Sequence, residues 1–340
     1  MEGILAKYRV AVIGCRNIGI AHAGGLVGMD NAELVAGCDL SDQLLAEFKE
    51  HWKETWPDLA LYKDHQEMLA KEKLDFVTVA TSDHLHADLV VNASNAGVKG
   101  ILCEKPLATT VADCERMLAA CERNRTVLSV DHSRRFMPFW RRIKEIVDEG
   151  TIGPVTNVVG TLAGERAMLF RNGTHVIDCM RWFAGGDPEW VFGELEAGYE
   201  DYTEYRGDGG HIPASEPGAH GYVHYSNGVR GIYIGGPKST ATPKFRMEVM
   251  GTDGFLTVNA ARAGTQCLLM KDEQAKTLDL GDEGMGGGIG LSVRDVIHAV
   301  DEGRAPYCPG AEAKGVVDVM LGFLESQRLG NVRVDLPLPA

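Results

Sequence analysis

Two glycines and one carboxylate near the N-terminus have the spacing of a nucleotide-binding loop. The apolar run RVAVI (9–13) leads into Gly14, Gly19 follows five positions later, and a second apolar run ends at Asp39. This spacing is typical of a loop that wraps a pyrophosphate and of an acid that accepts hydrogen bonds from the adenosine ribose. We therefore predict a dinucleotide site, with NAD favoured over NADP because a carboxylate would repel a 2′-phosphate. The predicted loop contacts are Gly14, Arg16, Asn17, Ile18 and Gly19.

Arg16 occupies the place of the middle glycine in the Gly-x-Gly-x-x-Gly pattern. That glycine normally lets the backbone come close to the pyrophosphate. Two interpretations stay open from the sequence. Either the Arg16 guanidinium contacts the pyrophosphate through a charge-assisted hydrogen bond, or Arg16 points into solvent beside the cofactor. A third interpretation, recruitment of NADP by Arg16, is disfavoured by Asp39.

Composition excludes several classes of protein. The chain has 340 residues, 44% of them hydrophobic, and a formal net charge of -14, so it lacks the net basic face that nucleic acids and anionic membranes require. The sequence contains no long apolar run and no visible secretory signal, and we expect a cytoplasmic protein. The eight cysteines show no C-x-x-C pair and no metal-ligand spacing, so we expect neither disulfides nor a metal.

Strand-like and helix-like segments alternate over about the first 130 residues. The runs RVAVIG, ELVAGCD, DFVTVAT, GILCEKP and TVLSVD are separated by amphipathic segments at 41–51, 84–96 and 111–124. This alternation predicts a parallel sheet covered by helices on both faces, so we assign residues 1–130 to a Rossmann domain of the α/β class. Its ligand is expected at the carboxyl ends of the strands.

Longer strand-like runs replace the alternation after residue 130. Expected strands cover 155–161, 190–199, 219–225, 229–234, 245–250 and 254–258. Asn227 and Gly228 stand between two of these runs, which is a strong hairpin signal. The pattern predicts a second, α+β domain over 131–340 with a large, mostly antiparallel open sheet and helices on one face. Its final helix, at about 311–329, could pack back on the first domain.

Several motifs resemble the Gfo/Idh/MocA family, named for glucose-fructose oxidoreductase, inositol dehydrogenase and rhizopine catabolism. Glu104, Lys105 and Pro106 in GILCEKPLATT look like its E-K-P signature. TSDHLHADLV (81–90) resembles its loop facing the nicotinamide half, and residues 132–155 resemble its domain-crossing segment. GTHVIDCMRWFAG (173–185) resembles its active-site helix, while 251–258 and 300–338 resemble its closing strand and final helix. The resemblance spans nearly the whole chain and implies an NAD(P)-dependent oxidoreductase acting on CH–OH groups.

The resemblance also implies roles for single residues. Lys105 stands at the carboxyl end of a predicted strand, where its ammonium can stabilise charge that develops on a substrate oxygen. His175 corresponds to the family's general acid/base. Asp178 lies one helical turn after His175 on the same helix face; it looks like an acceptor for a substrate hydroxyl, with a structural role in the first turn as the alternative. The implied contacts with the cofactor are Thr81, Ser82, His86, Glu104 and Lys105.

Arg171 departs from the commoner family pattern, in which an aspartate stands four residues before the histidine. A cation there cannot accept the imidazole N–H. Three interpretations stay open: His175 works with another partner, Arg171 together with Asn172 binds an anionic or strongly polar group of the substrate, or Arg171 turns into solvent. His132 and Arg134 follow the last Rossmann strand and are expected near the family's substrate cleft.

Two further segments are compatible with chemistry but favour structural roles. Positions 220, 222 and 224 (His, Tyr, His) alternate onto one strand face downstream of His211; they could reach a sugar, but a half-exposed sheet face is favoured over a metal site. The glycine-rich GMGGGIG (284–290) lacks the Gly-Lys-Ser/Thr ending of a phosphate loop. We expect a loop before a helix that Ser292 caps, with Asp295 in the capping-box position, and a role as a lid stays open.

The leading functional interpretation is an NAD-dependent oxidoreductase acting on a secondary hydroxyl of a sugar, glycoside or polyol. Its closest rival uses tightly bound NAD through a transient keto-sugar for net lyase, epimerase or glycosidase chemistry. A third interpretation is a non-catalytic sugar or nucleotide sensor on the same fold. The expected partner is a small-molecule sugar or polyol, with no nucleic acid and no membrane. In relatives the open face of the second sheet is a subunit interface, which implies a homodimer or homotetramer.

Overall fold

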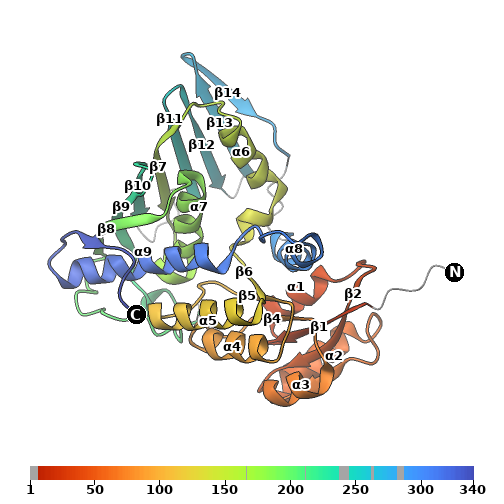
Figure 1. The fold of residues 1–340 in the computed structure, drawn as a ribbon. Helices are drawn as coiled ribbons and strands as arrows, with labels where there is room; N and C mark the ends of the chain where they lie inside the picture. Colours follow the sequence, from red (N-terminus) through yellow and green to blue (C-terminus); the bar gives the residue numbers. More distant parts are fainter. Residues whose placement is uncertain (1–6, 166, 211, 237–244, 262–263, 282–286) are drawn as a thin grey trace. The chain divides into compact units, whose positions relative to one another are not determined.

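The computed structural model describes residues 7–340 except 166, 211, 237–244, 262–263 and 282–286. The chain forms two compact units (Figure 1): residues 1–108, 113–136 and 286–311 make the first, and residues 109–112, 137–285 and 312–340 the second. The sequence pattern placed 131–340 in one domain. In the structure residues 286–311 belong with the first unit, because their helix packs on the helix that follows the nucleotide loop.

A six-stranded parallel sheet is the framework of the first unit, in the order β3-β2-β1-β4-β5-β6. Each neighbouring pair is parallel, and β4 and β5 are buried along their whole length, as expected for strands covered on both faces. The predicted Rossmann sheet is confirmed. The strands are β1 (Tyr8–Ile13), β2 (Ala32–Cys38), β3 (Ala60–Tyr62), β4 (Phe76–Val79), β5 (Gly100–Cys103) and β6 (Val127–Val130).

Helices follow the strands of this sheet and begin at recognisable signals. The Ser41 hydroxyl accepts from Leu44 N, and the Asp64 carboxylate accepts from Gln66 N, so two of the helices start at capped positions. The helices are α1 (Asn17–Gly25), α2 (Asp42–Trp52), α3 (His65–Glu72), α4 (His86–Asn95), α5 (Val111–Asn124) and α8 (Gly288–Glu302), with short 3-10 turns η1 (Asp83–Leu85) and η2 (Ser133–Phe136).

Helix α8 packs closely against α1, and this explains glycine at two places. A Cβ on Gly25 would lie 2.6 Å from the carbonyl oxygen of Gly290, so both positions need the smallest residue. Arg294 donates to the carbonyl oxygens of Gly25 and Val27 at 2.8 and 2.7 Å, which satisfies the C-terminal end of α1. The glycine-rich segment thus serves helix packing at Gly290, while residues 284–286 of it lie outside the described part of the chain.

The predicted cap of this helix is wrong. Helix α8 begins at Gly288 after an N-cap at Gly287, so Ser292 lies inside the first turns and donates to the Ile289 carbonyl at 2.6 Å. Asp295 accepts from Tyr307 N at 2.8 Å and pairs with Arg304 at 2.8 Å. The helix starts five residues earlier than a Ser292 cap allows, and Gly290 in its first turn packs against Gly25 of α1.

The second unit contains a nine-stranded sheet in the order β14-β13-β12-β11-β7-β10-β9-β8-β15. Only the β7–β10 pair is parallel among its described pairs, so the sheet is mostly antiparallel, as predicted. The strands are β7 (Val155–Leu162), β8 (Pro188–Leu195), β9 (Ala219–Tyr225), β10 (Arg230–Gly235), β11 (Phe245–Gly251), β12 (Gly254–Ala261), β13 (Gly264–Lys271), β14 (Gln274–Leu278) and β15 (Val334–Asp335).

The Asn-Gly hairpin is confirmed between β9 and β10. Gly228 has φ +83°, and Tyr225 N donates to the Val229 carbonyl across the turn. The six predicted strands correspond to β7 through β12, although β8 ends at Leu195 rather than at residue 199. β13, β14 and the two-residue β15 lie outside the ranges predicted from the sequence.

Helices cover one face of the second sheet. α7 (Thr174–Ala184) lies over β7 and β10, where a Cβ on Gly160 would meet the Val176 side chain at 2.4 Å. In α9 (Gly310–Arg328), the Phe323 ring packs on Gly193 and Gly221, so this part of the final helix packs on the second unit's own sheet. α6 (Pro138–Asp148) adds the Trp140 ring, which meets Phe245 edge-on with centroids 5.4 Å apart.

Candidate active site

The nucleotide loop joins β1 to α1, and its backbone requires glycine at two positions. Gly14 has φ +92°, and a Cβ there would lie 2.3 Å from the Ala80 carbonyl oxygen. A Cβ on Gly19 would lie 1.8 Å from the Gly14 carbonyl oxygen. Arg16 is the N-cap of α1 with φ -86°, a conformation open to any residue, and its side chain is exposed, as are those of Asn17 and Ile18. The loop therefore folds without a middle glycine, and the contact of Arg16 with a pyrophosphate stays a prediction.

Asp39 lies directly after β2 and fixes this loop. Its Oδ2 accepts from Cys15 N and its Oδ1 from Ser41 N, both at 2.9 Å. The carboxylate is half-buried at the carboxyl edge of the sheet, beside the start of α1. A fixed acid next to a helix N-terminus is the arrangement that a ribose and a pyrophosphate need. The residues present therefore fit a dinucleotide.

Lys105 follows β5 at the same edge of the sheet. Its backbone N donates to Glu104 Oε2 at 3.2 Å, and its peptide bond to Pro106 is cis. Glu104 N donates in turn to the Val79 carbonyl at 2.9 Å. The backbone just before Lys105 is thus held by the end of β4, while the Lys105 residue is partly exposed.

The loop after β4 reaches the same edge. Thr81 is half-buried and Ser82 exposed, whereas His86 is completely buried. The His86 ring lies 2.9 Å from the Pro106 carbonyl oxygen through Nδ1 and 3.4 Å from the Thr81 carbonyl oxygen through Nε2. His86 therefore holds two loops of the edge together, and its contact with the cofactor stays a prediction.

The residues that follow β6 are buried within the first unit. His132 Nδ1 lies 3.4 Å from the Cys308 sulfur, and the Arg135 guanidinium donates to the Tyr307 carbonyl at 3.3 Å. Arg134 is 8% exposed. These contacts anchor the segment before α9, while substrate contacts of His132 and Arg134 stay predictions.

In the second unit, a π-helical turn η3 (Leu169–Gly173) leads into α7. Gly173 N donates to the Met168 carbonyl at 2.8 Å, a wide turn of the kind often found at functional sites. Arg171 and Asn172 lie half-buried on this turn, and His175 lies half-buried in the first turn of α7. Asp178 follows one turn later and is completely buried. These four predicted substrate-side residues thus lie on one segment, in which the π-helical turn runs directly into α7.

Glu216, which no sequence motif marks as a site residue, fixes this segment. Its side chain is buried, and its Oε2 accepts from the backbone N of Phe170 and of Arg171, both at 3.0 Å. The Phe170 ring also stacks on Tyr205 with centroids 4.0 Å apart. Glu216 stands 45 residues beyond Arg171 in a loop without regular pattern, so no spacing in the sequence pointed to this contact.

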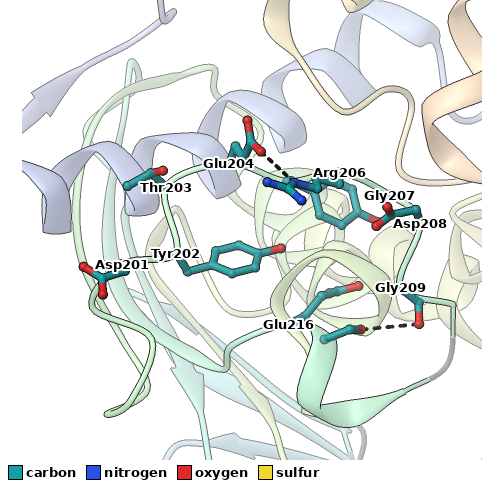
Figure 2. A pocket seen from close by; sticks show the side chains of 11 residues that line it. Asp201, Tyr202, Thr203, Glu204, Arg206, Gly207, Asp208, Gly209 and Glu216 are labelled. Atoms are coloured by element: carbon teal, nitrogen blue, oxygen red, sulfur yellow. Dashed lines mark hydrogen bonds and ion pairs between the residues drawn. The ribbon is translucent and has the colours of Figure 1, made fainter.

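The loop that carries Glu216 encloses a cavity of about 380 Å³ (Figure 2). The Tyr202 ring reaches into it between the Glu204–Arg206 ion pair and Glu216. Burial, the largest influence, and the charges of Glu216 and Asp208 raise the pKa of Tyr202 above its ordinary range. The cavity is thus lined by two tyrosines, Tyr202 and Tyr205, and by more acidic than basic side chains.

The His-Tyr-His alternation lies on one face of β9, as predicted. Tyr222 stacks between Trp190 and Phe192 of β8 at centroid distances of 5.1 and 5.3 Å, and His224 stacks on Trp190 at 5.0 Å. His224 Nδ1 lies 3.4 Å from a Glu189 oxygen. These side chains form a partly exposed aromatic face, and His211 lies outside the described residues.

Comparison with known proteins identifies the family. Residues 8–132 match an oxidoreductase family with an NAD-binding Rossmann fold, and residues 140–257 match the GFO/IDH/MocA C-terminal domain. The chain belongs to the Gfo/Idh/MocA family. This Gfo/Idh/MocA protein is therefore an NAD-binding oxidoreductase of a family of sugar and polyol dehydrogenases, and its cofactor is NAD.

A myo-inositol dehydrogenase and an apiose dehydrogenase are among the curated relatives of this chain. It is 28% identical over 340 residues to a myo-inositol 2-dehydrogenase of Thermotoga maritima, covering 96% of this chain and 97% of that protein. It is 33% identical over 194 residues to a D-apiose dehydrogenase of Paraburkholderia graminis, covering 53% of this chain and 50% of that protein.

Solved structures share the fold. A levoglucosan dehydrogenase with NADH and levoglucosan has a TM-score of 0.80 at 21% identity, covering 98% of this chain and 100% of that one. An oxidoreductase of Agrobacterium radiobacter with NAD+, L-tartaric acid and magnesium has a TM-score of 0.81 at 18% identity, covering 97% and 98%. Within the described residues, no helix has the length and apolar character needed to cross a bilayer.

Proposed function

We propose that this enzyme oxidises a secondary hydroxyl of a sugar, glycoside or polyol, and catalyses the reverse reduction, with Lys105 and His175 handling the proton. The observation that carries the proposal is Lys105 at the carboxyl end of β5, with its backbone held by Glu104 and part of the residue open to solvent. The names of the curated relatives, which act on inositol and apiose, support a polyhydroxylated substrate.

Each proposed residue has a chemical task. In the oxidation, His175 takes the hydroxyl proton, and the Lys105 ammonium stabilises the negative charge that develops on the substrate oxygen. NAD, held by the loop at Gly14 and Gly19 and by Asp39, would supply the acceptor for the hydride of the carbinol carbon, so that C=O would replace CH–OH. Arg171 and Asn172, on the turn before His175, bind polar groups of the substrate that do not react, and Asp178 orients a neighbouring hydroxyl.

Two measurements test the proposal. First, the purified protein is denatured, and released nucleotide is identified by mass spectrometry. An empty site leads to a screen of sugars and polyols by NADH absorbance, whereas stoichiometric retained NAD or NADH would favour redox-neutral chemistry through a keto-sugar. Second, Lys105→Ala should lower turnover by ~100-fold or more and change NADH affinity by only a few-fold.

Lys99→Ala is the matched control for this variant. Lys99 stands just before the opposite end of β5, is partly exposed and pairs with Asp75 at 2.9 Å. Its loss should leave turnover unchanged, because the ligand site of a parallel sheet lies at the carboxyl edge. Wild-type turnover in Lys105→Ala would remove Lys105 from the mechanism.

We also propose a homodimer or homotetramer that forms through the second sheet. Helices cover one face of this sheet, and the other face presents Phe192 and Ile232, which are 45% and 41% exposed. Trp190 and Tyr222 extend this apolar face across β8 and β9. Exposed apolar surface of this kind is typical of protein interfaces.

A further inference from the structure

Three titratable side chains meet in the interior of the first unit, beneath the nucleotide loop. His22 Nε2, on α1, lies 3.5 Å from Glu104 Oε1 and 3.6 Å from Asp131 Oδ2. Glu104 follows β5, Asp131 follows β6, and all three residues are buried, His22 completely. The cluster therefore ties the helix of the nucleotide loop to the ends of β5 and β6.

The cluster also contacts the backbone of Lys105 through Glu104. Glu104 turns Oε1 to His22 while its Oε2 accepts from Lys105 N at 3.2 Å. One carboxylate thus connects the histidine of α1 to the backbone of the proposed catalytic lysine. Lys105 and His86 also face Glu104, Cys103 lies next to it, and Asp83 in turn lies near Cys103.

Two buried carboxylates this close repel each other unless a cation lies between them. Burial is the largest influence on the pKa of His22 and lowers it, but the nearby Asp131 and Glu104 carboxylates, 3.6 and 3.5 Å from Nε2, together outweigh burial and raise the pKa to about 9. The same contact lowers the pKa of Glu104 against its burial, whereas burial raises the pKa of Asp131. The two carboxylates around Nε2 thus favour a charged histidine at neutral pH, and with both acids ionised the cluster would then carry one net negative charge.

We propose that His22 is a positioning residue for Lys105: as a buried imidazolium it compensates one charge of the Glu104–Asp131 pair and keeps Glu104 on the Lys105 backbone. This inference rests on the proposed role of Lys105. Without the imidazolium, the pair would carry two uncompensated negative charges. The Lys105 ammonium would then be drawn toward these carboxylates and away from the substrate oxygen.

The charge state of His22 can be measured without any activity assay. ¹⁵N-histidine spectra of the intact protein at pH 7.5 should show one imidazolium signal that disappears in His22→Gln. That signal should titrate to the neutral form only near pH 9. A neutral His22 ring at pH 7.5 would overturn the proposal, and this experiment uses the wild-type protein even if the variant folds poorly.

Thermal unfolding against pH gives a second readout. The folded-state pKa of His22 lies above its ordinary value, so its stabilising contribution is complete below about pH 6.5 and is lost as pH rises toward 9. The difference in Tm between wild type and His22→Gln should shrink over that interval. A difference that stays constant with pH would indicate a packing effect alone.

Kinetics separate positioning from general damage. His22→Gln should lower kcat by ~10-fold with little change in KM for NAD, and should move the alkaline limb of the kcat profile upward. His22→Gln combined with Asp131→Asn returns the cluster to one net negative charge and should restore most of kcat and the pH profile. Absence of rescue, or a wild-type profile in His22→Gln, would overturn the proposal.

Two controls distinguish other outcomes. If Lys105→Ala retains turnover, the proposed function fails whatever His22 does; if Lys105→Ala is inactive while His22→Gln is normal, only this inference fails. The three ligand atoms also lie close enough together to hold a metal ion. If the purified protein holds one equivalent of metal and His22→Gln does not, the cluster binds a metal ion and the imidazolium proposal is wrong.

Discussion

Asp39 is the residue on which cofactor preference should depend. Asp39→Ser should lower the ratio of kcat/KM for NAD to that for NADP by ~10-fold or more, because the carboxylate that repels a 2′-phosphate is gone. Affinity for NAD should fall as well, since Cys15 N loses its partner at 2.9 Å and the loop loosens. The ratio is measured by steady-state kinetics with each cofactor.

Asp42→Ser is the matched control for Asp39. Asp42 stands three residues later in the first turn of α2, and its side chain is 82% exposed and paired with Lys63. Asp42→Ser should leave the ratio of kcat/KM for NAD to that for NADP unchanged. An unaltered ratio in Asp39→Ser would show that this carboxylate does not lie at the ribose.

Residues that the local backbone geometry requires, such as the glycines of the nucleotide loop, were predictable from the sequence. Gly14 and Gly19 stand where a Cβ would collide with backbone, and their spacing carried that information. His22 and Glu216 were not found, because their partners lie 82 and 45 residues away in the chain, and only the folded sheet brings them together.

At the scale of elements, the π-turn before α7 depends on one buried acid. Glu216→Ala would leave Phe170 N and Arg171 N without their acceptor in a buried setting, which should lower the free energy of unfolding by ~2–4 kcal/mol. The turn carries Arg171 and Asn172, so KM for the substrate should rise by ~10-fold, more than kcat falls. Denaturant unfolding and steady-state kinetics measure the two effects.

Glu204→Ala is the control within the same loop. Glu204 is largely exposed and pairs with Arg206 at 2.7 Å, and an exposed pair contributes about 0–1 kcal/mol. Equal effects of the two variants would show that Glu216 does not hold the turn.

Elements were predictable where burial imposes a pattern. The strands β7, β9 and β10 alternate between buried and less buried residues, and their boundaries were found within a residue or so. β14 is exposed along most of its length, so it has no apolar alternation. Its hairpin with β13 turns at Asp272 and Glu273, which have φ of +51° and +61° without glycine, and so the usual turn signal is missing.

For the whole molecule, the order of the chain is a poor guide to which parts pack together. α8 begins 263 residues after the end of α1, yet Arg294 donates to the end of that helix at 2.8 Å. The family resemblance gave the fold, but a linear boundary at residue 130 did not foresee this return, because the packing is decided by Gly25 and Gly290 approaching each other.

The open face of the second sheet should decide the oligomeric state. If this face is a subunit interface, Phe192→Glu with Ile232→Glu places unpaired charges in a buried apolar contact, at a cost of several kcal/mol. The dissociation constant should therefore rise by ~100-fold or more, and light scattering after size exclusion should show monomers.

Val27→Glu is the control for exposure alone. Val27 lies in the first unit and is 44% exposed, close to the 45% of Phe192, but no sheet face surrounds it. It should keep the wild-type assembly, because a charge that stays in solvent costs little. A monomeric wild-type protein, or a double variant that assembles as wild type does, would show that this aromatic face does not join subunits. The Phe192→Glu/Ile232→Glu double variant should still bind NAD, since its two substitutions lie in the second unit whereas the nucleotide loop and Asp39 belong to the first unit. Val27→Glu should also still bind NAD.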